Sequence, residues 1–196
     1  METNNISSKM KQGNLRSLVE TAILVAVGCV LSLFVIYQAP HGGEVTPLAM
    51  LPILLIGLRN GLKWGLLGGF LYALLQMMVR FFAPPVPTAI AVASVVMLDY
   101  ILAFTVLGLS GLFKGKKYGI LYAAPLCLFL RFLCHFFSGI FVWSEAPFAQ
   151  AFSDGAIWLF SLLYNGSYMG IELILTTVVG FALCKAAPVV MSPIVK

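Results

Sequence analysis

Long apolar runs separated by short polar stretches form the main pattern of this 196-residue chain. The runs cover residues 18–39, 48–58, 64–79, 88–113, 118–143 and 156–184. A helix needs about 20 mostly apolar residues, with a range of about 17–25, to span the hydrocarbon core of a bilayer. Five of the six runs reach or approach this length, whereas the second is short and contains Pro52. The pattern predicts an all-α, polytopic membrane protein, and the number of crossings depends on the second run.

The composition agrees with this pattern, since 61% of the residues are hydrophobic, 10% are charged and the mean hydropathy is +1.00. Soluble domains contain about 45–50% apolar and about 25% charged residues. A chain of this size keeps much of its surface exposed, so it cannot hide such an apolar excess from water. The composition therefore excludes a soluble domain, a disordered chain and a nucleic-acid-binding protein, and the expected surroundings are a lipid bilayer.

The distribution of Lys and Arg indicates whether the second run crosses the membrane, because cytoplasmic loops are enriched in both residues. With six crossings and an inner N-terminus, Arg80 alone lies outside, and the inner side holds Lys9, Lys11, Arg16, Arg59, Lys63, Lys114, Lys116, Lys117, Lys185 and Lys196. Without the second crossing, most of these residues would lie outside. The distribution therefore predicts six transmembrane helices, both termini cytoplasmic, and outer loops near 40–47, 80–88 and 144–155.

This topology divides the chain into a cytoplasmic N-terminal tail, a six-helix membrane domain and a cytoplasmic C-terminal tail, at residues 1–17, 18–185 and 186–196. The four cysteines lie in apolar runs without a CxxC pair, as expected for small buried residues. We therefore expect no metal site and no cofactor.

Polar residues within the apolar runs are costly and usually face a cavity or a partner. The runs contain five such residues that matter here: Asp99, Arg131, His135, Asn165 and Glu172. At a rise of about 1.5 Å per residue, Asp99, His135 and Asn165 lie about 12–16 Å from the outer ends of three different helices. Their common depth favours a pocket open to the outside, with interhelical hydrogen bonding as the alternative. Arg131 and Glu172 lie deeper, at about 18–24 Å, and are interpreted as a structural ion pair, because either charge alone would be costly.

A stripe of residues spaced by four follows one face of the run 118–143, namely Arg131, His135, Gly139 and Trp143. The glycine leaves room between the histidine and the tryptophan for a flat group. Asp99 with Tyr100, and Glu44 in the first outer loop, add negative charge and an aromatic ring. Acidic and aromatic groups together suit a cationic, aromatic ligand, through charge pairing and cation–π contact.

Four segments carry a resemblance to a known family. They are Leu51-Pro52-Ile53 with Arg59-Asn60-Gly61 and Gly65, Leu98-Asp99-Tyr100 with Ala103-Phe104, Arg131-Phe132-Leu133-Cys134-His135 with Ser138-Gly139 and Trp143, and Tyr164-Asn165-Gly166-Ser167-Tyr168-Met169. In this order, the chain resembles the thiamine-specific substrate-binding (S) component of energy-coupling factor (ECF) transporters from Leu18 to Lys185. The His-x3-Gly-x3-Trp stripe followed by Tyr-Asn is the most specific part.

The resemblance implies a six-helix protein of the bacterial cell membrane that captures thiamine outside and hydrolyses nothing itself. Thiamine then passes through an ABC-type module with two ATPase subunits, which use ATP, and one transmembrane coupling protein. The residues implied to bind the ligand are Glu44, Asp99, Tyr100, His135, Gly139, Trp143, Phe160, Tyr164 and Asn165. In the family, two small residues on the first helix dock the coupling protein, and Ala22 and Ala26 match them. Small residues four apart allow another helix to approach closely.

The chain departs from the family pattern in four places. The acid at Asp99 is often glutamate there, and Phe160 stands where tyrosine is common. The aromatic residue that the family has near Glu44 has no clear counterpart, and the segment Pro84-Pro85-Val86-Pro87 is unusual. These differences keep open an S component for another small heteroaromatic, such as a thiamine precursor or a different vitamin. A standalone secondary transporter is a second alternative, although such folds usually show internal repeats and this sequence has none. An enzyme is not expected, because the HExxH and GxSxG motifs are absent.

Overall fold

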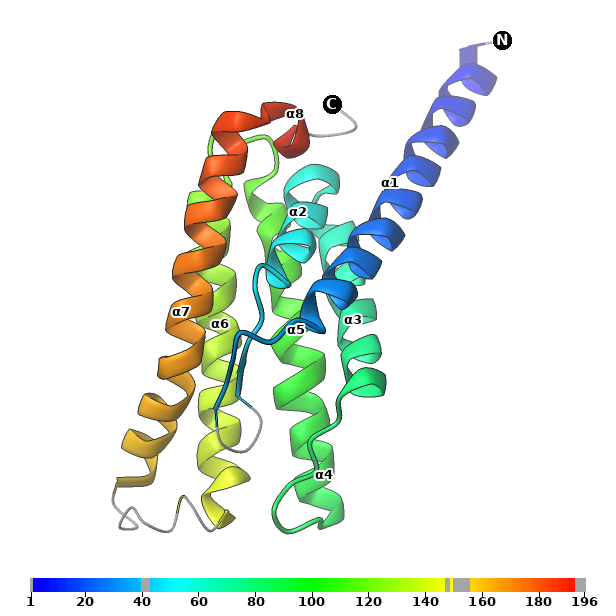
Figure 1. Ribbon diagram of the computed structural model, residues 1–196. Coiled ribbons are helices and arrows are strands. Elements are labelled where there is room, and N and C mark those ends of the chain that lie inside the picture. Colours follow the sequence, from blue (N-terminus) through cyan, green and yellow to red (C-terminus); the bar gives the residue numbers. More distant parts are fainter. Residues whose placement is uncertain (1, 40–42, 147–148, 150–155, 193–196) are drawn as a thin grey trace.

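The computed structural model describes residues 2–39, 43–146, 149 and 156–192, and most of them belong to one bundle of helices (Figure 1). The principal helices are α1 (Glu2–Ser32), α2 (Met50–Asn60), α3 (Leu62–Val79), α6 (Ile120–Phe141) and α7 (Ile157–Ala186). A helical rod between α3 and α6 consists of α4 (Ala89–Val95), the π-helix η2 (Val96–Leu102), α5 (Ala103–Thr105) and the 3-10 helix η3 (Val106–Phe113). The shorter elements are strands β1 (Tyr37–Gln38) and β2 (Glu44–Val45), the 3-10 helix η4 (Trp143–Glu145) and α8 (Pro188–Met191).

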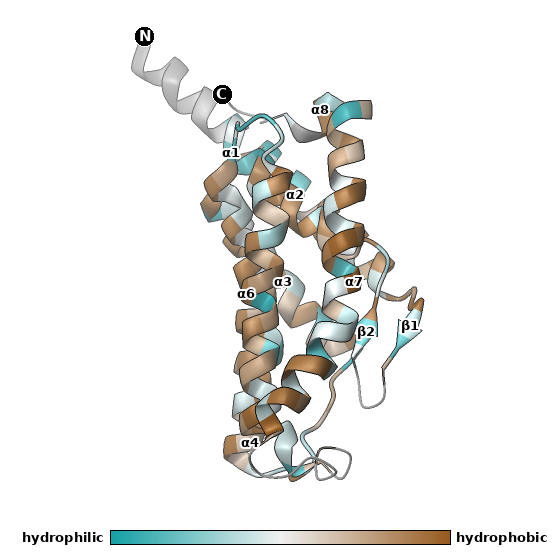
Figure 2. Ribbon diagram, turned by 90° about the vertical axis from the view of Figure 1, so that its left-hand side faces the viewer, coloured by the Kyte–Doolittle hydropathy of each residue, from teal (hydrophilic) through white to brown (hydrophobic). Residues whose placement is uncertain are grey.

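Within the described residues, five helices are long and apolar enough to cross a membrane: Gln12–Ser32, Leu62–Val79, Ala89–Phe113, Ile120–Phe141 and Ile157–Ala186. Hydrophobic residues predominate along these helices, whereas hydrophilic residues mark the two short strands and the end of the bundle that carries α8 (Figure 2). Apart from the two short strands, the regular elements of the described residues are helices. The prediction of an all-α membrane protein is confirmed.

Helix α2 differs from the spanning helix that the sequence predicts at 48–58. It has 11 residues and is therefore about 16 Å long, roughly half the thickness of a hydrocarbon core. Every residue from Met50 to Leu58 is buried. Helix α2 is thus a core element surrounded by the other helices, and it does not cross a bilayer by its own length.

The first apolar run also ends earlier as a helix than the sequence predicts. The run covers 18–39, but α1 ends at Ser32 and the chain continues into an antiparallel hairpin of β1 and β2, in which Tyr37 lies opposite Val45. At its other end, α1 extends through most of the segment 1–17 that the sequence predicts as a tail. The N- and C-termini lie at the same end of the bundle (Figure 1), and the hairpin lies beside α7, away from that end (Figure 2).

Glycines bring α2, α3 and η3 into backbone contact in the half of the bundle nearer the termini, which we call the closed half. A Cβ atom added at Gly108 would lie 2.3 Å from the backbone carbon of Gly65. A Cβ atom added at Gly111 would lie 2.3 Å from the nitrogen of Leu62, and one added at Gly57 would lie 2.6 Å from the nitrogen of Gly111. No side chain fits at such distances, so glycine is what permits these helices to approach so closely.

The rod Ala89–Phe113 begins at a side-chain cap and changes its helical type along its length. The hydroxyl oxygen of Thr88 accepts a hydrogen bond from the nitrogen of Ala91 over 3.2 Å, which satisfies one of the free donors at the helix start. The π-helix η2 follows, with Asp99 in its first turn. Such π segments are rare and frequently occur at functional sites, so the irregular turn directs attention to Asp99.

Candidate functional site

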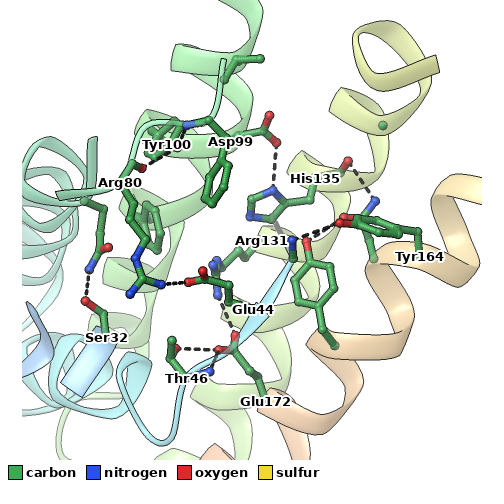
Figure 3. Close-up of a pocket in the computed structure, with 18 of the residues that line it drawn as sticks. Ser32, Glu44, Thr46, Arg80, Asp99, Tyr100, Arg131, His135, Tyr164 and Glu172 are labelled. Carbon is green, nitrogen blue, oxygen red and sulfur yellow. Dashed lines mark hydrogen bonds and ion pairs between the residues drawn. The ribbon is translucent and has the colours of Figure 1, made fainter. Parts of the chain in front are cut away.

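A cavity of about 140 Å³ lies in the half of the bundle away from the termini, which we call the cavity half. This volume is about ten times what one water molecule requires. All nine residues that the sequence predicts for ligand binding line it, namely Glu44, Asp99, Tyr100, His135, Gly139, Trp143, Phe160, Tyr164 and Asn165. The bundle therefore brings together residues from β2, the rod, α6, η4 and α7 around one space (Figure 3).

The Asp99 carboxylate accepts hydrogen bonds from three side chains that follow one another along α6 and η4. Its Oδ1 atom lies 2.9 Å from Nδ1 of His135, and its Oδ2 atom accepts from the hydroxyl of Ser138 over 2.6 Å and from the indole of Trp143 over 3.1 Å. These donors suit an ionised carboxylate, which only accepts hydrogen bonds. Asp99 thus joins the rod to α6 and holds a negative charge at the cavity wall.

The two ring nitrogens of His135 differ, because one contacts Asp99 and the other has no hydrogen-bond partner among the described residues. Because a carboxylate only accepts, the Nδ1 atom of His135 carries the proton that faces Asp99. The Nε2 atom is buried and has no hydrogen-bond partner among the described residues. A buried polar atom without a partner is unfavourable, so a ligand that hydrogen-bonds to Nε2 would remove this cost.

Gly139 and Asn165 form the seam between α6 and α7 at the cavity. A Cβ atom added at Gly139 would lie 2.1 Å from the hydroxyl oxygen of Ser161, so the room that the sequence assigns to a flat group beside this glycine is occupied by α7. The amide nitrogen of Asn165 donates to the carbonyl oxygen of Ser161 over 3.0 Å, and its amide oxygen accepts from the hydroxyl of Tyr168 over 2.7 Å. Asn165 therefore makes hydrogen bonds within the protein in addition to lining the cavity.

Aromatic rings from α7 form another wall. Phe160 and Tyr164 stack with their centroids 5.6 Å apart, and Tyr164 and Tyr168 meet edge to face at 5.9 Å. The hydroxyl oxygen of Tyr164 accepts a hydrogen bond from the backbone nitrogen of Gly43 over 3.0 Å, which fixes the hairpin against this wall. The wall offers ring faces, which suit an aromatic or cationic ligand.

Tyr100 supports the chain that follows α3. Its hydroxyl donates to the carbonyl oxygen of Arg80 over 2.8 Å and accepts from the nitrogen of Phe82 over 3.0 Å. Its ring stacks on Phe81 with the centroids 5.6 Å apart. The hydroxyl of Tyr100 is thus engaged within the protein, and its ring completes the cavity wall beside Asp99.

Arg131 and Glu172, which the sequence interprets as a structural ion pair, lie 2.9 Å apart and also line the cavity. Glu172 accepts two further hydrogen bonds, from the nitrogen and the hydroxyl of Thr46 at 3.1 and 2.9 Å. The Arg131 guanidinium lies over the ring of Phe104 at 4.7 Å. The pair therefore connects α6, α7 and the end of the hairpin.

Sequence reasoning missed Arg80, which lines the cavity and forms an ion pair with Glu44 (Figure 3). A signal was present, because Arg80 is the single basic residue that the topology leaves on the outer side. Ser138 was also missed as a donor to Asp99. On the α3 side, Gln76 donates to the hydroxyl oxygen of Ser32 over 2.8 Å, and both line the cavity.

The charged side chains around the cavity leave one negative charge over. Among the described lining residues, the carboxylates are Glu44, Asp99 and Glu172 and the guanidinium groups are Arg80 and Arg131. Each guanidinium is paired with a glutamate, whereas Asp99 contacts the imidazole of His135, which is a cation only when it is protonated. A singly charged cation would balance this site in surroundings of low dielectric constant.

Two other expectations concern regions away from the cavity. Ala22 and Ala26 are exposed on the outer surface of α1, and neither lines the cavity. Over the described part of the chain, no group of three His, Cys, Asp or Glu side chains is arranged to hold a metal ion.

Comparisons with known proteins agree on one family. The model of the thiamine transporter protein family (Thia_YuaJ) matches residues 18–192. The thiamine transporter ThiT of Bacillus subtilis is 32% identical over 187 residues, which cover 87% of this chain and 91% of that protein. The thiamine transporter ThiT of Lacticaseibacillus paracasei is 28% identical over 193 residues, which cover 87% and 88%. A solved structure of ThiT from Listeria monocytogenes has the same fold, with a TM-score of 0.75 and 23% identity over 92% of this chain and 99% of that one.

Proposed function

Because the chain belongs to the thiamine transporter protein family, it is a multi-pass membrane protein for thiamine transport rather than an enzyme, and we propose that thiamine binds in the cavity around Asp99. The observation that carries the proposal is the Asp99 carboxylate at the cavity wall, which no Lys or Arg among the described residues pairs with. Thiamine carries one fixed positive charge on its thiazolium ring. The cavity therefore matches the ligand in sign and in number of charges.

The remaining lining residues suit the rest of the molecule. The Nε2 atom of His135 is buried without a partner among the described residues, and it can hydrogen-bond to the aminopyrimidine ring. The rings of Trp143, Phe160 and Tyr164 offer stacking surfaces for two flat heterocycles. Asn165 already bonds to neighbouring residues, so its role is to position the wall at the pyrimidine end.

The test is a titration of the purified protein with thiamine and with its neutral pyrimidine fragment, followed by tryptophan fluorescence or calorimetry. We expect saturable thiamine binding that is much tighter than binding of the fragment, because only thiamine carries the charge that balances Asp99. Mass spectrometry of the ligand that co-purifies with the protein should identify thiamine. Recovery of a different heteroaromatic, with no thiamine binding, would contradict the proposal.

We also propose six crossings with both termini cytoplasmic. The five long helices account for five crossings, and α2 together with the hairpin of β1 and β2 supplies the remaining one. An even number of crossings agrees with the position of both termini at one end of the bundle (Figure 1). A cysteine introduced at position 82 should react with a membrane-impermeant reagent added to intact cells, whereas a cysteine at 116 should not.

For transport, we propose that the chain is the S component of an ECF transporter and docks its coupling protein through Ala22 and Ala26. Both alanines are exposed and four residues apart on α1, which permits close helix–helix approach. Ala22→Leu or Ala26→Leu should abolish uptake and leave thiamine binding unchanged. Ala182→Leu, at an exposed position of α7, makes the same change in size and should preserve uptake. Uptake by the Ala26→Leu protein at the wild-type rate would remove this face from the interface.

A further inference from the structure

One of the residues that line the cavity is positively charged and partly exposed, namely Arg80. Arg80 follows the last residue of α3, and its guanidinium forms an ion pair with Glu44 on β2. The Arg80 side chain is 31% exposed and that of Glu44 is 12% exposed, so the carboxylate is the more buried partner. Figure 3 shows this pair facing the same space as Asp99 and His135.

The backbone at Arg80 is held in place rather than free to swing away. Its carbonyl oxygen accepts from Tyr100, the residue next to Asp99, over 2.8 Å. Glu44 is held from its other side, because its Oε1 atom accepts a hydrogen bond from Gln38 over 3.1 Å. These hydrogen bonds hold the backbone at Arg80 and the carboxylate of Glu44 beside the cavity.

We propose that Arg80 acts as a built-in counter-cation that neutralises Glu44 and sets the net charge of the cavity. Arg131 does the same for Glu172 from a deeper position. Without Arg80 the cavity would hold two unbalanced carboxylates and would attract cations more strongly and less selectively. Arg80 is thus a residue that tunes charge specificity, and the inference rests on the proposed binding of a cationic ligand.

The charges predict a specific order of thiamine affinities among variants. Arg80→Gln frees the Glu44 carboxylate and should tighten thiamine binding by about tenfold. Glu44→Gln leaves the Arg80 guanidinium unbalanced and should weaken binding by about tenfold. The double variant removes both charges and should bind more weakly than Arg80→Gln but more tightly than Glu44→Gln. Arg80→Lys keeps the positive charge and should lie closer to wild type than Arg80→Gln does.

Two controls separate charge from structure. Arg59→Gln also removes an arginine from an ion pair, with Glu20, but in the closed half and outside the cavity, so it should leave thiamine affinity unchanged. The neutral pyrimidine fragment has no charge to respond to Arg80, so its affinity should differ by less than about twofold among all variants.

The experiment is calorimetry of thiamine and the fragment on the purified full-length variants, with thermal unfolding recorded for each. The order Arg80→Gln, double variant, Glu44→Gln, from tightest to weakest for thiamine alone, supports the inference. Weaker binding of both ligands by Arg80→Gln would show that the ion pair mainly holds the hairpin in place, and this would overturn the inference. Unchanged thiamine affinity of Arg80→Gln would overturn it as well. A wild-type protein that binds no thiamine would refute the proposed function itself, which this series distinguishes from a failure of Arg80 alone.

Discussion

The closed half and the cavity half differ in how their helices pack against one another. In the closed half, α2, α3 and η3 meet through Gly57, Gly65, Gly108 and Gly111, and the contact consists of backbone against backbone. In the cavity half, α6 and α7 still approach closely at Gly139, but hydrogen-bonded polar side chains such as Asp99 surround a cavity. The first arrangement gives close packing and the second leaves a cavity, so substitutions in the two halves should affect different properties.

The largest effect is expected for the buried ion pair of Arg131 and Glu172, at the cavity wall. Glu172→Gln would leave the buried guanidinium of Arg131 without its carboxylate, and breaking a buried ion pair costs about 3–5 kcal/mol. Thermal unfolding of the detergent-solubilised protein should therefore begin at a markedly lower temperature. Combining it with Arg131→Gln should recover part of the loss. If Glu172→Gln unfolds like wild type, the pair contributes no stability.

Gly108→Ala tests the closed half. Its Cβ atom would have to displace the backbone of α3, and overpacking of this kind costs about 3 kcal/mol. We expect a lower unfolding temperature but an affinity for thiamine within about twofold of wild type in the protein that remains folded. Gly170→Ala is the matched control, because its Cβ atom meets nothing within 4 Å and should not destabilise the protein. A loss of affinity by Gly108→Ala without a loss of stability would contradict the division into halves.

Asp99→Asn tests the cavity half. The substitution keeps the size of the side chain and removes the one unbalanced charge, so thiamine binding should weaken by at least about tenfold, or about 1.4 kcal/mol. The neutral pyrimidine fragment should lose less, and Asp99→Glu should keep more of the thiamine affinity than Asp99→Asn. Parallel titrations with the two ligands measure the difference. Equal thiamine affinity of Asp99→Asn and wild type would exclude Asp99 from the site.

A smaller effect is expected for Ser138→Ala, which removes one donor to Asp99 and leaves the charge in place. A hydrogen bond to a charged group contributes about 1.5–3 kcal/mol to stability. Because His135 and Trp143 still contact the carboxylate, thiamine affinity should fall by only about threefold. Ser167→Ala is a control, because its hydroxyl bonds to the carbonyl oxygen of Tyr164 on the exposed side of α7. An effect of Ser138→Ala as large as that of Asp99→Asn would show that orientation of the carboxylate matters as much as its charge.

The sequence predicted the long helices and the meeting of Asp99, His135 and Asn165, because apolar length and the depth of polar residues are both encoded locally. It could not predict the end of α1 at Ser32, since the residues that follow are as apolar as a continuing helix. Nor could it predict that Ser161 fills the space beside Gly139. That contact depends on how two helices face each other, and a small residue permits a neighbouring helix as readily as a ligand.

Arg80 illustrates a different limit. The sequence indicates its charge and its outer position. Its partner Glu44, however, belongs to an outer loop whose fold the apolar pattern does not specify. Ion pairs between segments distant in sequence depend on the tertiary structure, whereas hydrophobic periodicity reports only on single elements.

The π-helix η2 has a consequence for the angular position of residues along the rod. Each residue of an α-helix advances about 100° around the axis, and a π turn contains an additional residue relative to that repeat. The π-helix at Val96–Leu102 and the 3-10 helix η3 therefore together set the rotation between Asp99, which faces α6, and Gly108, which faces α3. Deleting one residue there would shift one end of the rod by about a quarter turn relative to the other. The irregular turn thus changes the direction in which side chains leave the rod, so that one part of the rod presents a carboxylate to α6 and another presents a glycine to α3.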